Sequence, residues 1–280
     1  MTTTKPSGPD GTALRVGVLG LGEAGSIFAA GLAAAAGEVR GFDPADVPVP
    51  AGVSVTGTPA KAVAGAGVVI ALTHAAQARE AAASAVAHMP PGAYYADFST
   101  SDPGLKRDLA ELARAHGLRF IDGAIMNPVP LLGIATQVDV SGDDAAEFAA
   151  LLTPLGLRLQ ALGPEPGLAA TRKLLRSVLV KGLSALIIES MRAAETAGVA
   201  DWYREHLIEQ LCGIDREFVI RLVRGNLQHG PRRVHEMAAA STLLRQYGEP
   251  PLTAEATRQV LESVADRGVP DLSAEPPPGG

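Results

Sequence analysis

The chain has 280 residues, of which 47% are hydrophobic, 19% charged and 4% aromatic. This balance excludes an intrinsically disordered chain and predicts a core built from aliphatic side chains. The net charge of −6, without a basic block, argues against nucleic acid and anionic membrane as partners. The single cysteine, Cys212, excludes internal disulfides and cysteine-based zinc sites. No segment reads as a membrane span or a signal peptide, so we expect a soluble cytoplasmic protein.

Short β-branched runs alternate with alanine-rich helical stretches from residue 14 to about residue 163. We predict strands at 14–19, 38–42, 68–72, 94–98, 119–121, 136–141 and 157–162. We predict helices between them at 23–36, 59–65, 75–88, 103–116 and 143–153. This alternation is typical of βαβ units with a parallel sheet.

The pattern after Gly163-Pro164 is helical, with predicted breaks at Gly198, Gly230-Pro231 and Gly248–Pro251. Its first helix, at about 167–197, is long and apolar. We therefore expect an α/β Rossmann domain at 13–165 and a smaller all-α domain at 166–269, linked by that long helix. Residues 1–12 and 270–280 are rich in Pro, Gly, Ser and Thr, and we expect them to be flexible tails.

A strand runs directly into the glycine loop G-x-G-x-x-G, formed by Gly20, Gly22 and Gly25. In such a loop the first glycine permits a tight turn, the second lets the backbone approach a pyrophosphate, and the third lets the helix pack against the sheet. The strand before it and the helix after it predict a dinucleotide site. The alternative is a structural turn that binds nothing.

Asp43 ends the second predicted strand, 23 positions after Gly20. This spacing suits an acid that accepts a hydrogen bond from a ribose 2′-hydroxyl. A carboxylate repels a 2′-phosphate, so Asp43 favours NAD over NADP. Arg40 lies close enough in sequence to offer an NADP site the opposite charge, and the cofactor is therefore predicted as NAD or NADP with NAD preferred.

The long helix carries a polar stripe on an otherwise apolar surface, because Lys173, Ser177 and Lys181 are spaced four apart. The chain has only 5 Lys among its 24 cations, so a lysine at an apolar helical position stands out. A partly buried lysine can exchange a proton with a substrate alcohol, which arginine cannot do. The alternative is that both lysines are solvated at the helix surface.

The glycine loop, Asp43, the segment Asp97–Pro103 and the Lys173 helix together resemble the β-hydroxyacid dehydrogenases, which include 3-hydroxyisobutyrate and 6-phosphogluconate dehydrogenases. The resemblance covers about residues 14–195. It implies that the cofactor is bound by Gly20, Leu21, Gly22, Glu23, Ala24, Gly25, Asp43, Leu72, Thr73, Gln77 and Thr100. It implies that the substrate, a small carboxylate, is bound by Ser99, Asn127, Lys173 and Ser177, with Lys173 and Ser177 catalytic.

Several positions depart from the family pattern. Met126 and Asn127 stand where the family carries Ser-Gly in its carboxylate-binding loop, and Ser177 stands where most members have Asn. These departures leave the substrate open. His74 is a possible cofactor contact, and Arg232, Arg233 and His235 are possible anion contacts from a partner subunit, although all four are also ordinary surface residues.

The resemblance implies an NAD(P)-dependent oxidoreductase that transfers a hydride between the cofactor and a small β-hydroxy acid or related alcohol, with Lys173 as general acid and base. Two alternatives stay open: an imine reductase, which shares the architecture, and a cofactor-binding regulator without catalysis. The apolar residues of the 167–197 helix cover more than one face, which a small helical domain does not bury alone. We therefore expect a homodimer joined mainly through residues 167–267.

Overall fold

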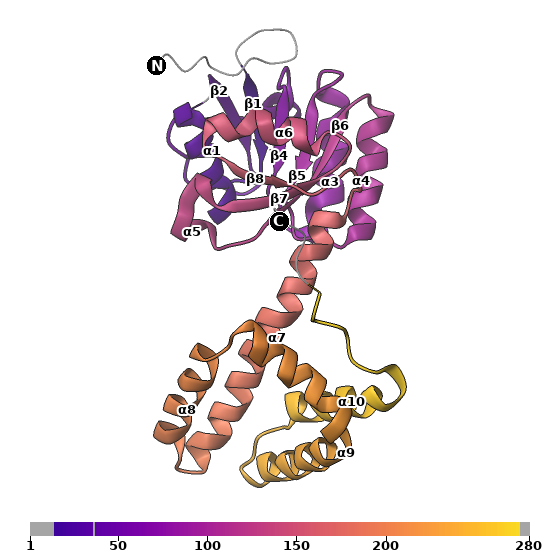
Figure 1. The fold of residues 1–280 in the computed structure, drawn as a ribbon. Coiled ribbons are helices and arrows are strands. Elements are labelled where there is room, and N and C mark those ends of the chain that lie inside the picture. The colour runs from indigo at the N-terminus through magenta and orange to yellow at the C-terminus, as the bar shows by residue number, and fades with distance from the viewer. Residues whose placement is uncertain (1–13, 36, 275–280) are drawn as a thin grey trace. The chain divides into compact units, whose positions relative to one another are not determined.

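The computed structural model describes residues 14–35 and 37–274, so the predicted tail at 1–12 and the last six residues of the other tail lie outside the described residues. The chain divides into two compact units between Arg176 and Ser177 (Figure 1). The first turns of the long helix thus belong to the first unit, whereas the sequence placed the domain boundary at 165.

An eight-stranded sheet forms the first unit, in the order β3-β2-β1-β4-β5-β6-β7-β8. Its strands are β1 (Arg15–Leu19), β2 (Glu38–Phe42), β3 (Ser54–Val55), β4 (Val68–Ala71), β5 (Tyr94–Asp97), β6 (Arg119–Ile125), β7 (Gln137–Ser141) and β8 (Arg158–Ala161). All seven predicted strands are present. The short edge strand β3 was not predicted, because two residues carry no periodic pattern.

The predicted parallel sheet is confirmed for most of the strands, and one edge departs from it. Strands β1 to β6 pair in parallel, but β7 pairs antiparallel with β6, and β8 follows the direction of β7. Only residues 126–136 join β6 to β7, and a parallel return needs a crossover of about a dozen residues or more. The short connection therefore reverses the chain.

Helices cover both faces of the sheet (Figure 1). They are α1 (Glu23–Ala35), α2 (Pro59–Val63), α3 (Ala75–Ala85), α4 (Pro103–Ala115), α5 (Val129–Leu132) and α6 (Ala145–Leu152), with 3-10 turns at 86–88, 133–135 and 153–155. Alternate residues of β4 separate two cores. Ile70 packs with α1 and α6, whereas Val69 packs with α2, α3 and α4.

Helices are the regular secondary structure of the second unit, and its described residues include no strand. It contains the rest of α7 (Leu168–Thr196), then α8 (Ala200–Cys212), α9 (Arg216–Gln246) and α10 (Leu252–Arg267). The predicted break at Gly230-Pro231 is wrong, since α9 continues through Pro231. A proline removes only one helical hydrogen bond, and the rest of α9 packs against α10. The actual break after Cys212 was not predicted.

Glu189 of α7 fixes the start of α10. Its carboxylate accepts hydrogen bonds from the backbone N–H and hydroxyl of Thr253 at 2.7 and 2.5 Å, and from the backbone N–H of Ala254 at 3.0 Å. Burial raises the pKa of Glu189, but these hydrogen bonds outweigh it and hold the pKa below its ordinary value. An acid thus substitutes for the missing side-chain cap of α10.

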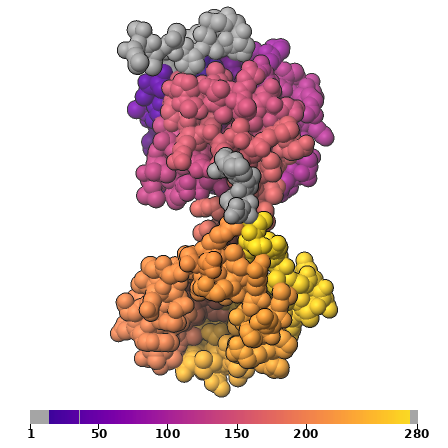
Figure 2. Space-filling model, viewed as in Figure 1, coloured from indigo at the N-terminus to yellow at the C-terminus, as the bar shows by residue number. Residues whose placement is uncertain are grey.

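A cavity of about 330 Å³ with almost wholly apolar walls lies among α7, α8, α9 and α10, lined in part by Ala193, Trp202, Met237 and Leu243. Figure 2 shows that the surface of this helical unit is hollowed. Nearer its start, α7 exposes apolar side chains, including Val178, which is 73% exposed, and Leu179, which is 70% exposed. None of the described helices has the length and apolarity needed to cross a bilayer.

Candidate cofactor and substrate site

The strand order reverses between β1 and β4, and ligands of such sheets bind at the carboxyl ends of the strands at this point. The glycine loop follows β1 there. Gly20 has φ +90, and an added Cβ would lie 2.6 Å from the carbonyl oxygen of Leu72. A Cβ on Gly25 would lie 1.9 Å from the carbonyl oxygen of Gly20, whereas one on Gly22 would meet nothing within 4 Å. Gly20 and Gly25 are thus required by close packing, whereas Gly22 borders open space.

Asp43 lies against the glycine loop. Its Oδ2 accepts a hydrogen bond from the backbone N–H of Leu21 at 2.7 Å, and its Oδ1 accepts one from Ala45 at 2.9 Å. Arg40 is turned to other partners: its Nε lies 2.7 Å from Glu38 Oε1, and Arg15 completes that ion-pair cluster. The hydrogen bond from Arg15, together with Arg40, holds the pKa of Glu38 below its ordinary value despite partial desolvation.

A cleft of about 340 Å³ opens beside the loop, between the ends of β1, β2 and β4 and the helix α3. Gly20, Pro44, Thr73 and Gln77 line it, with Glu80 on the α3 wall. Thr73 and Gln77, which follow β4 and which the resemblance implied as cofactor contacts, thus both line the cleft.

A second cavity, of about 280 Å³, is a neighbour of the first, since Thr73 lines both. Its walls come from the ends of β4, β5 and β6 and from the first turns of α7. The lining residues are Ala24, Leu72, Thr73, Phe98, Ser99, Thr100, Ile125, Asn127, Val129 and Lys173. The structure therefore brings together residues far apart in sequence that the resemblance assigned to cofactor and substrate.

The other candidate residues lie elsewhere. Ser177 follows Lys173 by one turn of α7, begins the second unit and does not line this cavity. His74 is exposed at the start of α3. In α9, Arg232 pairs with Glu236 and Arg233 with Asn226, so both guanidinium groups have partners within their own helix.

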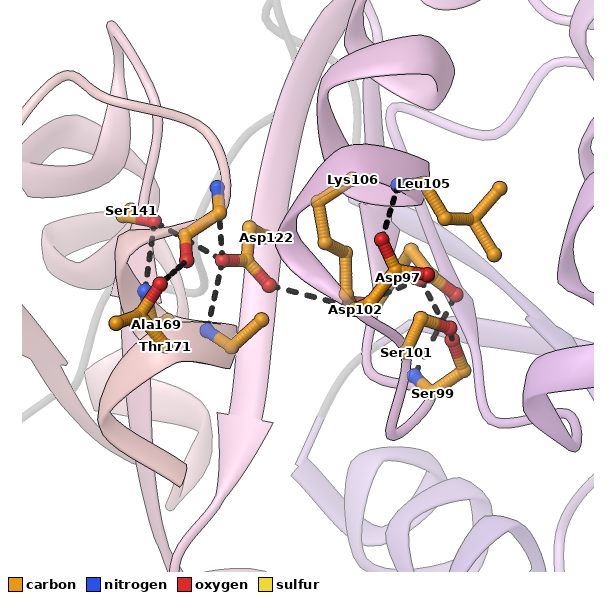
Figure 3. Close-up of polar contacts among 12 residues, drawn as sticks. Asp97, Ser99, Ser101, Asp102, Leu105, Lys106, Asp122, Ser141, Ala169 and Thr171 are labelled. Atoms are coloured by element: carbon orange, nitrogen blue, oxygen red, sulfur yellow. Dashed lines mark hydrogen bonds and ion pairs between the residues drawn. The ribbon is translucent and has the colours of Figure 1, made fainter. Parts of the chain in front are cut away.

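A buried ion-pair cluster joins β5, β6 and α4 next to Ser99, which lines the second cavity (Figure 3). Asp97 of β5 and Asp122 of β6 are register partners, and both are 0% exposed. Lys106 of α4, also 0% exposed, places its Nζ 2.8 Å from Asp97 Oδ2 and 3.2 Å from Asp122 Oδ1. It also donates to the backbone carbonyl of Asp97 at 2.7 Å. One ammonium thus lies within ion-pair distance of two carboxylates that are neighbours across the strand pair.

Asp122 also anchors α7. Its Oδ2 accepts hydrogen bonds from the backbone N–H groups of Gly167 and Ala170 at 3.1 and 3.0 Å, and from the hydroxyl of Ser141 at 3.2 Å. Ser141 in turn accepts from the backbone N–H of Ala169 at 3.2 Å. A carboxylate at a helix N-terminus satisfies donors that have no partner inside the helix. These contacts fix the turns that carry Lys173.

Asp97 orders the opposite wall. Its Oδ2 accepts a hydrogen bond from Ser99 Oγ at 2.7 Å, and Ser99 Oγ lies 2.6 Å from Ser101 Oγ (Figure 3). Burial, and then the negative charge of Asp97, raise the pKa of the neighbouring Tyr95 well above its ordinary value. The hydroxyl of Ser99, implied as a substrate contact, is thus engaged by Asp97 and Ser101.

Sequence reasoning did not single out Lys106, although a signal was available. The buried face of α4 consists of Lys106, Leu109, Ala110 and Ala113, which is the helical spacing of a core stripe. A lysine at the first position of such a stripe needs buried acids as partners. Lys106 is therefore a clearer case than Lys173 of a lysine at an apolar helical position.

Two observations fit these cavities to a nicotinamide dinucleotide. The space beside Gly22 admits a close approach to the backbone, as a pyrophosphate requires. Thr73 lines both cavities, and its Oγ1 is buried and has no hydrogen-bond partner among the described residues. Such an orphaned hydroxyl suits a polar group of a bound molecule.

Two family models match the chain. Residues 15–127 match the NAD-binding domain of 6-phosphogluconate dehydrogenase, and residues 194–264 match a domain of unknown function, DUF1932. The first match covers the glycine loop, Asp43 and the ends of β4 and β5. It confirms the predicted dinucleotide-binding domain.

The chain is also similar to two proteins of unknown function. An uncharacterized 28.5 kDa protein of Methanothermus fervidus is 24% identical over 176 residues, which are 61% of this chain and 66% of that protein, just under two thirds of its length. A conserved protein of unknown function, described as structurally similar to 3-hydroxyacid dehydrogenases, is 29% identical with a TM-score of 0.60, covering 91% of this chain and 99% of that one.

A more distant structure shares the fold alone. A reductive aminase from Aspergillus terreus in complex with NADPH4, cyclohexanone and allyl amine is 19% identical, with a TM-score of 0.72 over 94% of this chain and 97% of that one. Residues 15–127 are thus similar to the NAD-binding domain of 6-phosphogluconate dehydrogenase and residues 194–264 to DUF1932, and the chain has the NAD(P)-binding fold of the hydroxyacid dehydrogenase-like proteins.

Proposed function

We propose that this protein is an NAD(P)-dependent oxidoreductase that interconverts a small β-hydroxy acid, or a related alcohol, and the corresponding carbonyl compound. One observation carries the proposal: Lys173 lines the same cavity as Thr73 and Thr100, and Thr73 also borders the cleft beside the glycine loop. A proton-transferring group is thus next to the place expected for a nicotinamide.

The glycine loop and Asp43 would hold the cofactor, which supplies the hydride chemistry when bound. The residues for this are Gly20, Leu21, Gly22, Glu23, Ala24, Gly25, Asp43, Leu72, Thr73, Gln77 and Thr100. The carboxylate of Asp43 beside Leu21 supports a preference for NAD, because it repels a 2′-phosphate. The pairing of Arg40 with Glu38 supports the same preference, since it engages the nearest candidate for a phosphate contact.

Lys173 would take the proton from the substrate hydroxyl during oxidation and return it during reduction. Asn127 is exposed in the same cavity and has an amide that both donates and accepts hydrogen bonds. The amide of Asn127 can hydrogen-bond to a carboxylate, which supports a small carboxylic acid as the substrate. Ser99 shapes the wall, and Ser177 remains a candidate substrate contact on α7.

We also propose that the protein acts as a homodimer joined through its helical unit. The exposed stripe on α7 includes Leu175 at 66%, Val178 at 73% and Leu179 at 70%, which is unusual for a stable solvent-facing helix. A second copy is the simplest cover for a continuous apolar surface, and symmetric dimers are the commonest oligomers.

A substrate panel tests the activity. Purified protein is incubated with NAD or NADP and a series of small β-hydroxy acids and alcohols, while the absorbance of the reduced cofactor is followed. In the reverse direction, NADH or NADPH is supplied with keto acids, or with ketones plus amines. Oxidation of a hydroxy acid supports the proposal, turnover of imines alone supports the imine reductase reading, and cofactor binding without any turnover supports a regulator.

A further inference from the structure

The cluster of Lys106, Asp97 and Asp122 joins both walls of the second cavity without touching it, since none of the three lines that cavity. We infer that Lys106 is a positioning residue for the candidate catalytic site. Through Asp122 it fixes the first turns of α7 and hence Lys173, and through Asp97 it fixes Ser99. The inference rests on the proposed function, because that function makes Lys173 catalytic, but its test does not require the protein to be active.

The charges explain why Lys106 is needed. Asp97 and Asp122 face each other on neighbouring strands with no access to water, and like charges in this arrangement repel. The Lys106 ammonium donates a hydrogen bond to the backbone carbonyl of Asp97 and makes an ion pair with one oxygen of each carboxylate. Asp122 Oδ1 has no hydrogen-bond partner among the described residues, so the ion pair with Lys106 is its main stabilising contact. Removing the ammonium would leave two buried carboxylates with no cation between them.

The consequence for α7 follows from the second oxygen of Asp122. Because Oδ2 holds the N–H groups of Gly167 and Ala170, any shift or protonation of this carboxylate weakens the anchor of the helix. Arg172, the neighbour of Lys173, reaches Asp139 of β7 at 3.3 Å, but its side chain is 47% exposed. The buried anchor of these turns is therefore Asp122, and Lys106 holds it in place.

The test measures how fast the amine of Lys173 reacts, which needs neither substrate nor turnover. Full-length protein is treated with trinitrobenzenesulfonate, and modification of each lysine is followed by peptide mass spectrometry. In Lys106→Met we expect Lys173 to react about tenfold faster, the change expected when hydrogen bonds to a charged anchor are lost. The exposed residues Lys61 and Lys181 should react as in the wild type.

A double-mutant cycle shows whether Lys106 acts through Asp122. Asp122→Asn should give a similar rise, and the double variant should show no further rise, because both changes break one anchor. Leu109→Ala is the matched control: it removes a buried side chain from the same helix α4 but leaves the charges intact. It should lower the melting temperature without changing the reactivity of Lys173 well below that temperature.

If Lys106→Met does not fold, Lys106→Gln is measured in its place, because its amide keeps hydrogen-bond donors without the charge, and the same rise is expected. Unchanged reactivity of Lys173 in a folded Lys106 variant, additive effects in the double variant, or an equal rise in Leu109→Ala would each overturn the inference. The proposed oxidoreductase activity would be unaffected by such a result, since it is measured separately with the substrate panel.

Discussion

The carboxylate of Asp43 accepts a hydrogen bond from the backbone N–H of Leu21, 2.7 Å away and 22 positions earlier in the chain. The acid at the end of β2 is therefore fixed against the loop that would receive the pyrophosphate. Its second oxygen is held by Ala45. Two backbone hydrogen bonds thus hold the carboxylate of Asp43 next to the loop.

The first prediction concerns the cofactor. We expect NADH to bind more tightly than NADPH, and Asp43→Ala to narrow the difference by about tenfold, because hydrogen bonds to a charged group are worth about 1.5–3 kcal/mol. Calorimetric titration of both cofactors measures it. A wild-type preference for NADPH would refute the prediction.

The second prediction separates two glycines of the loop. Gly22→Ala should fold with a near-normal melting temperature but bind NADH weakly, because its Cβ enters the open space beside the loop. Gly25→Ala should not fold stably, because its Cβ would meet a backbone oxygen at 1.9 Å. Thermal melts and NADH titration of both variants give the comparison. Normal NADH affinity in Gly22→Ala would place the cofactor elsewhere.

The third prediction concerns proton transfer. Lys173→Ala should lower turnover of the substrate identified in the panel by about 10²–10⁴-fold and leave NADH affinity nearly unchanged. Lys173→Arg should restore little, because a guanidinium does not release its proton. Stopped-flow rates with either variant test this. An Arg variant as fast as the wild type would mean that only a positive charge is needed.

The fourth prediction concerns acid stability of the helical unit. The hydrogen bonds from α10 outweigh the effect of burial and hold the pKa of Glu189 below its ordinary value, so its stabilising effect is complete above that ordinary value. The effect is lost as the pH falls through the lowered pKa. Glu189→Gln should therefore be less stable than the wild type at pH 7, and the difference should shrink on acidification. Chemical denaturation followed by the fluorescence of Trp202 measures it, and a difference that does not change with pH would contradict it.

The fifth prediction concerns assembly. Light scattering on dilute protein should give about twice the chain mass, because the apolar stripe on α7 needs cover. Leu179→Arg should shift the protein toward the monomer without changing its helical content, since this side chain is 70% exposed in the single chain. A wild type that stays monomeric at low micromolar concentration would contradict the dimer.

Much of this protein follows from local sequence pattern. Period-two and helical patterns predicted every strand of the sheet except β3, and the glycine spacing with Asp43 predicted the dinucleotide-binding domain that the family match confirms. These features depend on residues close in the chain. The G-x-G-x-x-G turn joins one strand to one helix, so its chemistry is visible in a short segment.

The direction of β7, the course of α9 through Pro231 and the buried role of Lys106 depended on the tertiary structure. Asp97, Lys106, Asp122 and the start of α7 come from four elements, and only strand pairing places the two carboxylates opposite each other. Electrostatic energy in a protein interior depends on distance and burial, not on order along the chain. The sequence alone therefore determined the dinucleotide-binding domain, and the tertiary structure decided which lysine is buried as an anchor and which lines the cavity.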